Sequence, residues 1–532
     1  MPENNDENGY NGKMPPSARF LPAEHTSVLS VNPHVAQIKP VKRSRKLFLL
    51  AGLALVLVSS LGFYFLTTGR TTSGGGDKKR IAVLPLKPIN TESRDDIYEV
   101  GIADSLIYKL SSMKGLVVRP LSAVRKYKDL EQDPLAAGRE QQVDYILESS
   151  YQLAGGHIRV TSRLFNVASG QIEETYKSEK DAANVFAMQD AIAGQVGNFL
   201  LARFAATSSS PMARRGTNNV EAYRLYLQGM YLYGKRTPKA SKKAVELLDQ
   251  AVRLDPNYAL AWAGKAHAHR YRGNLGRDTN TYVEYQNSAV ALNEALLLDK
   301  DLSEAYSALC ENKYYYEWDF AGAERECKRA IELDPNSSMA HEIYGRYLFH
   351  RGHVDEAIIE LKTAIALDPT SLFNQRNLGI ALYYAGRYDE AVGQFKQVIA
   401  TDENFTTAYL WLRNALEMQG NYSEAFEWLM KAQKALSADE ETVRLYKTAY
   451  QTSGYQGVLR AQAERFEKGN SHFYIGAILN AQIGNKNKAF EYLEKSYQRR
   501  EWGMNSLLVE PHLGSLRSDP RFDELVKRIG LK

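Results

Sequence analysis

Chemistry in this sequence could come from two cysteines or from a glycine pair beside a histidine. Cys310 and Cys327 are the only cysteines among 532 residues, so neither a disulfide framework nor a cysteine-built metal site is expected. The pair Gly155-Gly156 lacks the strand–GxGxxG–helix context that binds phosphate. His157 follows it in an expected turn, with no second histidine or cysteine nearby to share a metal. We therefore predict structural roles for these residues.

Two adjacent carboxylates, Asp95 and Asp96, are the remaining candidates for acid–base chemistry. They precede an apolar pattern of helical spacing, where carboxylates stabilise the start of a helix through its dipole. The sequence contains no nucleophile–base pair, metal-spaced cluster or phosphate loop. We therefore predict that the protein is not an enzyme and uses no cofactor or metal.

A different chemistry, recognition of a polypeptide, is suggested by aromatic residues that recur together with arginine and asparagine. Adjacent aromatic side chains at equivalent positions of a repeated helix suit the capture of a peptide segment. Aromatic packing between helices explains any single tyrosine equally well. The predicted partner-binding residues are Asn312, Tyr315, Tyr316, Arg346, Phe349, Arg376, Tyr383, Tyr384 and Asn414.

A repeat positions these residues. Leu-Asp-Pro or related triplets carry aspartates at 255, 299, 334, 368 and 402, whose spacings are 44, 35, 34 and 34 residues. A 34-residue period with proline after the second helix is the tetratricopeptide signature. Gly345 and Gly379 take equivalent positions, where a small residue lets the two helices of a hairpin approach closely. We predict an all-α tetratricopeptide superhelix over residues 217–510, with about seven hairpins and a cap at 511–532.

Two irregularities accompany the repeat. The first spacing is ten residues longer than 34, and we place the insertion in a loop around residues 271–281. Cys310 and Cys327 occupy two apolar positions of one repeat, which predicts buried free thiols. Oxidation of this pair in the periplasm is left open.

A smaller α/β domain is expected over residues 80–206. Apolar runs and alternating runs around glycine-containing turns predict strands, and a 3.6-residue period predicts helices. The order βαβαβββα indicates a single compact sheet with helices packed on it. The expected strands are 81–86, 116–118, 143–153, 158–167 and 171–179, and the expected helices are 96–113, 134–141 and 185–206.

This domain resembles a known family. IAVLPL at 81–86, the GIADSL helix at 101–106 and VDYILE at 143–148 are similar to the TolB amino-terminal-like (FlgO-like) domain. Ser149 departs from the glycine expected after the acidic residue of that strand. The family often follows a membrane span in bacterial CadC-like regulators and adenylate cyclases, so the resemblance implies an extracytoplasmic part of a membrane protein.

A membrane anchor precedes the domain. Residues 47–66, LFLLAGLALVLVSSLGFYFL, contain no charge over twenty positions, and a helix of that length spans about 30 Å of hydrocarbon. Five basic residues lie just before the run and four after it, which favours a cytoplasmic N-terminus. We predict a disordered cytoplasmic tail at 1–46, a transmembrane helix at 47–66, a linker at 67–79, and a bacterial inner-membrane protein whose bulk is periplasmic.

The net charge of +5 is small for this length, so composition gives no case for nucleic acid binding, and we do not expect a nucleic acid partner. We predict a membrane-anchored scaffold that binds a protein or peptide partner through its repeat groove. The alternative is the signal-sensing part of a CadC-like transcriptional regulator, for which residues 1–46 are too short to form the winged-helix DNA-binding domain. Self-association is left open.

Overall fold

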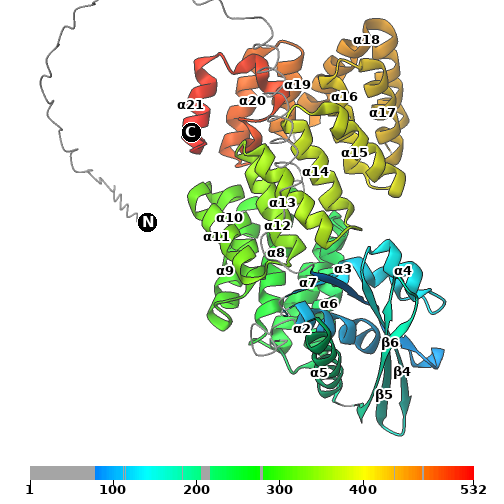
Figure 1. The fold of residues 1–532 in the computed structure, drawn as a ribbon. Coiled ribbons are helices and arrows are strands. Elements are labelled where there is room, and N and C mark those ends of the chain that lie inside the picture. Colours follow the sequence, from blue (N-terminus) through cyan, green and yellow to red (C-terminus); the bar gives the residue numbers. More distant parts are fainter. Residues whose placement is uncertain are drawn as a thin grey trace, which may run out of the picture. The chain divides into compact units, whose positions relative to one another are not determined.

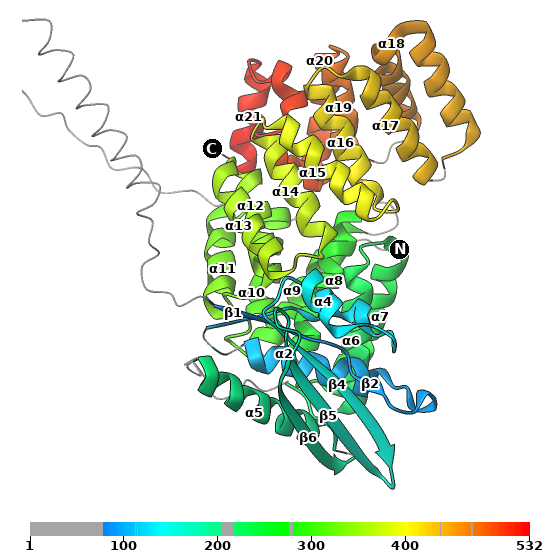
Figure 2. The same cartoon turned by 45° about the vertical axis from the view of Figure 1, so that its right-hand side comes forward.

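A small mixed sheet begins the described part of the chain, and a helical superhelix follows it (Figures 1 and 2). The computed structural model describes residues 78–111, 113, 115–182, 184–204, 216–275, 280–436, 438–469 and 472–531. Residues 76–532 form one compact unit. The predicted tail, span and nearly all of the predicted linker lie outside the described residues. Within the described residues, no helix is both long enough and apolar enough to cross a bilayer.

The sheet has the order β3-β1-β4-β5-β6. Its first three strands pair in parallel, and β4, β5 and β6 pair antiparallel. Gly155 and Gly156 form the turn between β4 and β5 with φ of 57° and 78°, a conformation that glycine adopts without steric cost. The strands are β1 (Lys79–Val83), β2 (Lys87–Pro88), β3 (Leu116–Val118), β4 (Tyr145–Ala154), β5 (His157–Asn166) and β6 (Ile172–Asp181).

The predicted strand at 81–86 is in fact divided. β1 ends at Val83, and a separate short strand, β2, pairs with β4 from Lys87. Pro85 lies between them and has no N–H group with which to continue a ladder. The α- and π-helices of this region are a π-helix (Ile97–Gly101), α2 (Ile102–Ser111), α3 (Leu121–Val124), α4 (Pro134–Glu140) and α5 (Val185–Phe204). The predicted small sheet with packed helices is confirmed, and the structure adds that its pairing is mixed.

Helical hairpins make up the rest of the unit. Seven pairs of separate helices are present among the described residues, and α18 (Glu440–Gly469), broken at Ser453 and Gly454, lies between the sixth and seventh pairs. The pairs are α6 (Val220–Gly234) with α7 (Pro238–Leu254), α8 (Ala259–Leu275) with α9 (Thr281–Leu298), α10 (Ser303–Asn312) with α11 (Phe320–Leu333), α12 (Ser338–His350) with α13 (Val354–Leu367), α14 (Leu372–Tyr384) with α15 (Tyr388–Thr401), α16 (Thr406–Met418) with α17 (Tyr422–Ala435), and α19 (Phe473–Gln482) with α20 (Lys486–Gln498).

The glycines of the repeat act as predicted. A Cβ added at Gly345 would lie 2.7 Å from Leu361, and one added at Gly379 would lie 2.5 Å from Phe395. Both distances are shorter than van der Waals contact, so the helices of these hairpins approach too closely for a larger residue. The 34-residue pattern is therefore a packing requirement.

The ten extra residues of the second repeat mainly lengthen its helices. The sequence predicted a loop around residues 271–281, but α8 continues as helix to Leu275 and α9 begins at Thr281. The two helices have 17 and 18 residues, whereas α12 and α13 have 13 and 14. Additional turns extend both helices at the end where they meet, and the extended part carries Tyr271 and Asn274.

The prediction of two free thiols was wrong. Cys310 and Cys327 form a disulfide, with their Cα atoms 5.2 Å apart, a separation in the ordinary range for a bridge. The bond joins α10 to α11 within one hairpin. The repeat pattern predicted that both side chains are buried, but apolar spacing along the chain does not give the distance between two positions on facing helices.

The C-terminal segment does more than cover the last hairpin. This segment, residues 499–531, follows α20 and contains two short 3₁₀ helices (Trp502–Ser506 and Pro511–Leu516) and α21 (Pro520–Ile529). The guanidinium of its Arg528 bonds Glu494 of α20 at 2.8 Å. The same segment also reaches earlier repeats, because Arg351 after α12 donates to the carbonyl of Leu531 at 3.2 Å. The end of the chain therefore packs against the array's inner helices.

Candidate functional site

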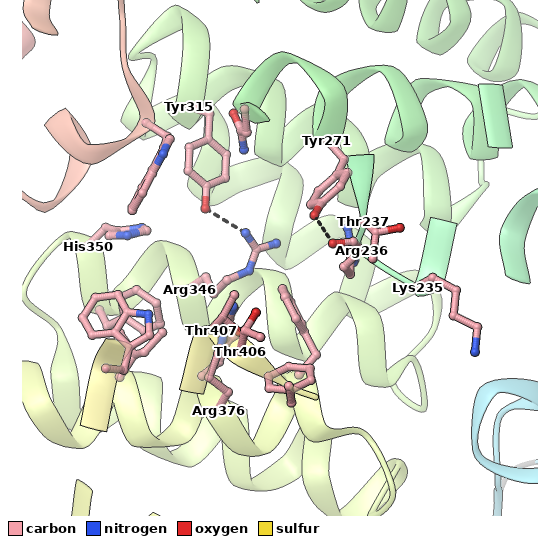
Figure 3. A pocket seen from close by; sticks show the side chains of 18 of the residues that line it. Lys235, Arg236, Thr237, Tyr271, Tyr315, Arg346, His350, Arg376, Thr406 and Thr407 are labelled. Carbon is pink, nitrogen blue, oxygen red and sulfur yellow. Dashed lines mark hydrogen bonds between the residues drawn. The ribbon is translucent and has the colours of Figure 1, made fainter. Parts of the chain in front are cut away.

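A cavity of about 310 Å³ lies on the inner surface of the repeat array (Figure 3). Helices α8, α12 and α14 and the start of α16 line it, together with the turn between α6 and α7. Its cationic lining residues are Lys235, Arg236, Arg270, Arg346 and Arg376, and its aromatic lining residues are Tyr271, Tyr315, Phe349, Phe373, Tyr384, Phe405, Trp411 and Trp502. We call this cavity the inner pocket. It has no acidic lining residue among those the structure describes.

The turn between α6 and α7 forms one wall. Arg236 has a φ of 51°, and its carbonyl accepts a 2.5 Å hydrogen bond from the hydroxyl of Tyr271 on α8. Thr237 then caps α7, since its side chain accepts from the N–H of Ala240. The turn is thus held from both sides, and it presents Lys235 and Arg236 beside α8.

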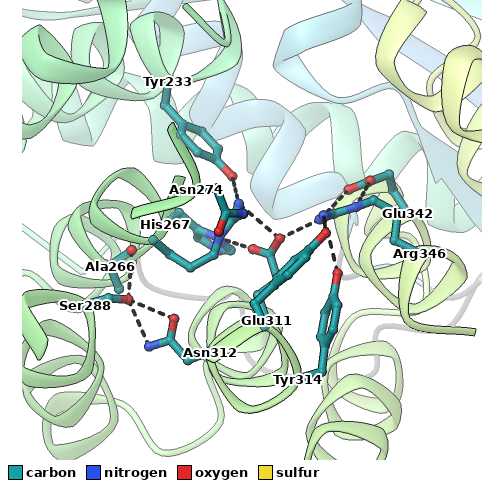
Figure 4. Close-up of polar contacts among 12 residues, drawn as sticks. Tyr233, Ala266, His267, Asn274, Ser288, Glu311, Asn312, Tyr314, Glu342 and Arg346 are labelled. Atoms are coloured by element: carbon teal, nitrogen blue, oxygen red, sulfur yellow. Dashed lines mark hydrogen bonds and ion pairs between the residues drawn. The ribbon is translucent and has the colours of Figure 1, made fainter. Parts of the chain in front are cut away.

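A buried ionic network forms the floor (Figure 4). Glu311 of α10 is fully buried and pairs with Arg270 of α8, 3.0 Å away, and with Arg346 of α12. Arg346 also pairs with Glu342 and donates to the hydroxyl of Tyr315 at 2.8 Å. Two carboxylates thereby balance the two arginines, and the network connects three consecutive repeats.

Burial and the neighbouring arginines have opposite effects on the pKa of Glu311. Burial alone would raise the pKa of Glu311, but Arg270 and Arg346 outweigh it and hold the pKa well below its usual range. His350, one turn beyond Arg346, has its pKa lowered to about 3 by burial and by that arginine. Glu311 is therefore ionised at neutral pH and His350 is neutral.

The other cations of the inner pocket are not part of the ion pairs of this network. Among the described residues, no ion pair involves Lys235, Arg236 or Arg376. The guanidinium of Arg376 donates to the Asn377 side chain at 2.6 Å, and burial lowers the pKa of Arg376 to about 10. Arg376 therefore remains cationic near neutral pH. The inner pocket is lined by five basic and no acidic residues among those the structure describes, so it carries an excess of positive charge.

Three guanidinium groups converge on the ring of Phe373. Their carbon atoms lie 4.3 Å from its centroid for Arg376, 4.9 Å for Arg236 and 5.9 Å for Arg346. A cation–π contact of this kind contributes about 0.5–2 kcal/mol, which offsets part of the repulsion between neighbouring cations. The ring holds the cations close together without neutralising them.

Five of the nine predicted partner-binding residues line the inner pocket. Four lie on the first helices of two successive hairpins, and Tyr315 lies just after the first helix of the hairpin before them, in the π-helical turn Lys313–Glu317. This is the surface where the groove was predicted. The five are Tyr315, Arg346, Phe349, Arg376 and Tyr384.

The other four predicted residues lie elsewhere. Asn312 is buried and donates to the hydroxyl of Ser288 at 3.0 Å. The ring of Tyr316 stacks on Tyr285, and the carboxamide oxygen of Asn414 accepts from Arg413.

Tyr383 is covered by the chain's own C-terminal segment. Its hydroxyl donates to Glu510 at 2.8 Å, and its side chain is fully buried. The same segment contacts the neighbourhood of Tyr316, whose carbonyl accepts from Arg500. The repeat consensus gives the inner face of each helix but carries no signal for this long-range contact.

Several lining residues escaped the sequence prediction. Phe373 precedes Arg376 by three positions on α14, so a helix-face argument applied to the whole helix would have included it. Tyr271 was assigned to a loop and is in fact helical. Trp502 comes from the C-terminal segment, and no local pattern in the sequence places it beside α14.

Comparison with known families supports the repeat assignment. The family described as tetratricopeptide repeat matches residues 313–371 and 376–440. These residues include α11 to α13, α14 from Arg376 onward, and α15 to α17, and therefore most of the inner pocket's helices. The chain contains tetratricopeptide repeats.

One curated relative is "Putative adenylate cyclase 3" of Rhizobium meliloti (strain 1021), which is 28% identical over 186 residues. The match covers 35% of this chain and about a third (32%) of the relative's length. Similar solved structures include YrrB, titled a TPR protein with an unusual peptide-binding site (19% identity, 38% of this chain and 98% of that chain, TM-score 0.27). Others are a human IFIT1 dimer with m7Gppp-AAAA (16%, 59% and 81%, TM-score 0.38) and a thermophilic TPR protein of Thermus thermophilus (18%, 37% and 98%, TM-score 0.31).

Proposed function

We propose that this protein is a non-enzymatic scaffold that binds a polypeptide partner in the inner pocket. The observation that carries the proposal is the convergence of aromatic walls and cations from consecutive tetratricopeptide repeats on one cavity. Tetratricopeptide repeats bind protein segments through the inner helices of the superhelix. Aromatic side chains and arginines are the residue types that contribute most to binding energy at protein interfaces.

Affinity capture with matched variants tests the proposal. Tyr384→Ala and Trp411→Ala each remove an aromatic wall, and Tyr282→Ala removes an aromatic side chain that is 58% exposed on α9. Proteins captured from solubilised membranes by the wild-type chain should be lost with the first two variants and kept with the third. Equal capture by all four chains would contradict the proposal.

We also propose that residues 47–66 anchor the chain in a bacterial inner membrane with the repeats in the periplasm. The charge-free run and the basic residues before it support this placement. The Cys310–Cys327 disulfide supports it independently, because such bonds persist in oxidising compartments. We expect a protease added to spheroplasts to digest the C-terminal region. Protection of this region until the spheroplasts are lysed would contradict the proposed placement.

A CadC-like regulatory role is the second candidate function. The observation that favours it is the contact between the sheet region and the turn before α14. Arg119 donates to the carbonyl of Leu367 at 3.1 Å, and Ser122 donates to Asp368 at 2.7 Å. Because α14 carries Phe373 and Arg376, occupancy of the inner pocket would reach the sheet region through this turn. Pocket substitutions should then change hydrogen exchange at β3 and α3, and no change there would count against regulation.

A further inference from the structure

The cations that line the inner pocket outnumber the carboxylates that pair with them. The carboxylates of Glu311 and Glu342 pair with Arg270 and Arg346. No described carboxylate pairs with Lys235, Arg236 or Arg376, although all three line one cavity of about 310 Å³. Cations placed close together repel one another, and partial burial strengthens that repulsion because the local dielectric is lower than that of water. A bound anion would remove it.

Two more features of the inner pocket favour an anion. Helix α16 begins at Thr406, which lines the cavity, and its N-cap residue Phe405 makes no side-chain cap. The start of a helix carries a partial positive charge, although here the N–H groups of Thr406 and Ala408 already bond the carbonyls of Asn404 and Phe405. His350, 5% exposed, has an Nδ1 atom without a hydrogen-bond partner among the described residues.

The walls define the rest of the ligand. The rings of Tyr271, Phe373, Tyr384 and Trp411 line the cavity beside the cations. They would take an apolar or aromatic side chain next to the anionic group. A cavity of about 310 Å³ is at the small end of ligand sites, so it holds a few side chains and no folded domain.

We propose that the partner segment bound in the inner pocket is acidic, with Asp or Glu carboxylates alternating with aromatic side chains. The inference rests on the proposed polypeptide-binding function and adds the partner's chemistry to it. Guanidinium groups bind carboxylates in a bidentate geometry, so Arg236 and Arg376 take the acidic side chains while the rings take the aromatic ones. A peptide is favoured over a nucleic acid strand because the cations are confined to one small cavity, whereas strand binding needs a continuous cationic path.

Fluorescence anisotropy with the full-length chain in mild detergent tests this inference. The probe is a fluorescein-labelled octapeptide that alternates Glu with Phe and has an amidated C-terminus. Its matched partner carries Gln in place of every Glu, and an oligouridylate octamer is the third ligand. We expect the Glu peptide to bind at least tenfold more tightly than the other two ligands. The difference should shrink as salt rises, because ions screen partly exposed charges.

Substitutions in the inner pocket test which residues bind the Glu peptide. Arg236→Gln and Arg376→Gln should each weaken binding of the Glu peptide about tenfold or more, whereas Arg376→Lys, which keeps the charge but loses the bidentate geometry, should weaken it less than Arg376→Gln. Arg253→Gln on α7 is the control, because Arg253 is exposed and pairs with Asp249 away from the cavity. Thermal midpoints within a few degrees of wild type show that each variant is folded.

Equal binding of the Glu and Gln peptides would overturn the acidic preference, and so would tighter binding of the octamer or failure of both peptides to bind. If both peptides bind equally and Tyr384→Ala abolishes both, polypeptide binding itself still holds. If instead Tyr384→Ala leaves the capture of proteins from solubilised membranes unchanged, the proposed polypeptide-binding function fails together with the acidic preference.

Discussion

At the scale of single residues, Glu311 determines whether the floor of the inner pocket is stable. It is the shared partner of two buried arginines from neighbouring repeats. Removing one member of a buried ionic network leaves uncompensated charge and costs about 3–5 kcal/mol. We expect Glu311→Ala to lower the free energy of unfolding by that amount in urea titration. Lys495→Ala, which removes a surface ion pair with Glu491, should change it by less than about 0.5 kcal/mol, and equal effects would contradict the assigned role of the network.

His512 gives the C-terminal segment a pH dependence. Burial alone would lower its pKa, but Glu417 and Glu510, each 2.9 Å from a ring nitrogen, outweigh burial and raise the pKa to about 9. Tyr383 also bonds Glu510, and Arg413 pairs with Glu417. Since the pKa is raised in the folded state from 6.5, the stabilisation is complete below pH 6.5 and is lost as pH rises to 9.

The expected loss between pH 6.5 and 9 is about 2–3 kcal/mol, at about 1.4 kcal/mol per pKa unit. Urea midpoints measured across this range check it. His512→Gln should be less stable at pH 6.5 and should show a flatter dependence on pH. If the stability of His512→Gln depends on pH as steeply as that of the wild type, a group other than His512 causes the pH dependence.

At the scale of elements, the glycines of the hairpins give a paired prediction. Gly379→Ala should destabilise the protein by about 1–3 kcal/mol, because its Cβ would overlap the buried ring of Phe395. Gly393→Ala lies on an exposed position of α15 with no atom within 4 Å of the new Cβ, and should stabilise it by up to about 1 kcal/mol. Thermal midpoints of the two variants should move in opposite directions, and a shift in the same direction would contradict the packing.

The disulfide between α10 and α11 predicts sensitivity to reductant. Its 17-residue separation corresponds to about 3 kcal/mol of stabilisation by restriction of the unfolded chain. The wild-type chain should lose thermal stability in dithiothreitol, whereas a Cys310→Ser, Cys327→Ser double variant should not respond. Free thiols detected by maleimide labelling of the chain isolated without reductant would contradict the bond.

Sequence periodicity predicted the elements well and the contacts between them poorly. The strand at 116–118 and the hairpins from α10 to α17 follow from apolar spacing and the 34-residue period, because local pattern and packing agree there. Five of the nine predicted groove residues line the inner pocket for the same reason. Tyr383 and Trp502 depend on contacts between distant parts of the superhelix, and the Cys310–Cys327 bond depends on the distance between two facing helices of one hairpin. No local pattern encodes either.

At the scale of the whole molecule, the described chain is a superhelix whose own end covers part of its inner surface. The C-terminal segment buries Tyr383 and contributes Trp502 to the inner pocket, so only part of the inner surface is available to a partner. The central claim is that this remaining part binds a polypeptide.

Site-specific photo-crosslinking in living cells tests that claim most directly. A benzophenone-bearing phenylalanine at Phe373 places the crosslinker among the three guanidinium groups of the inner pocket. The same residue at Ile359 of α13, which is 64% exposed, is the control. We predict a polypeptide adduct from position 373 and none from position 359. Adducts from position 359 alone, or none at position 373 while the chain is folded and present, would contradict the account.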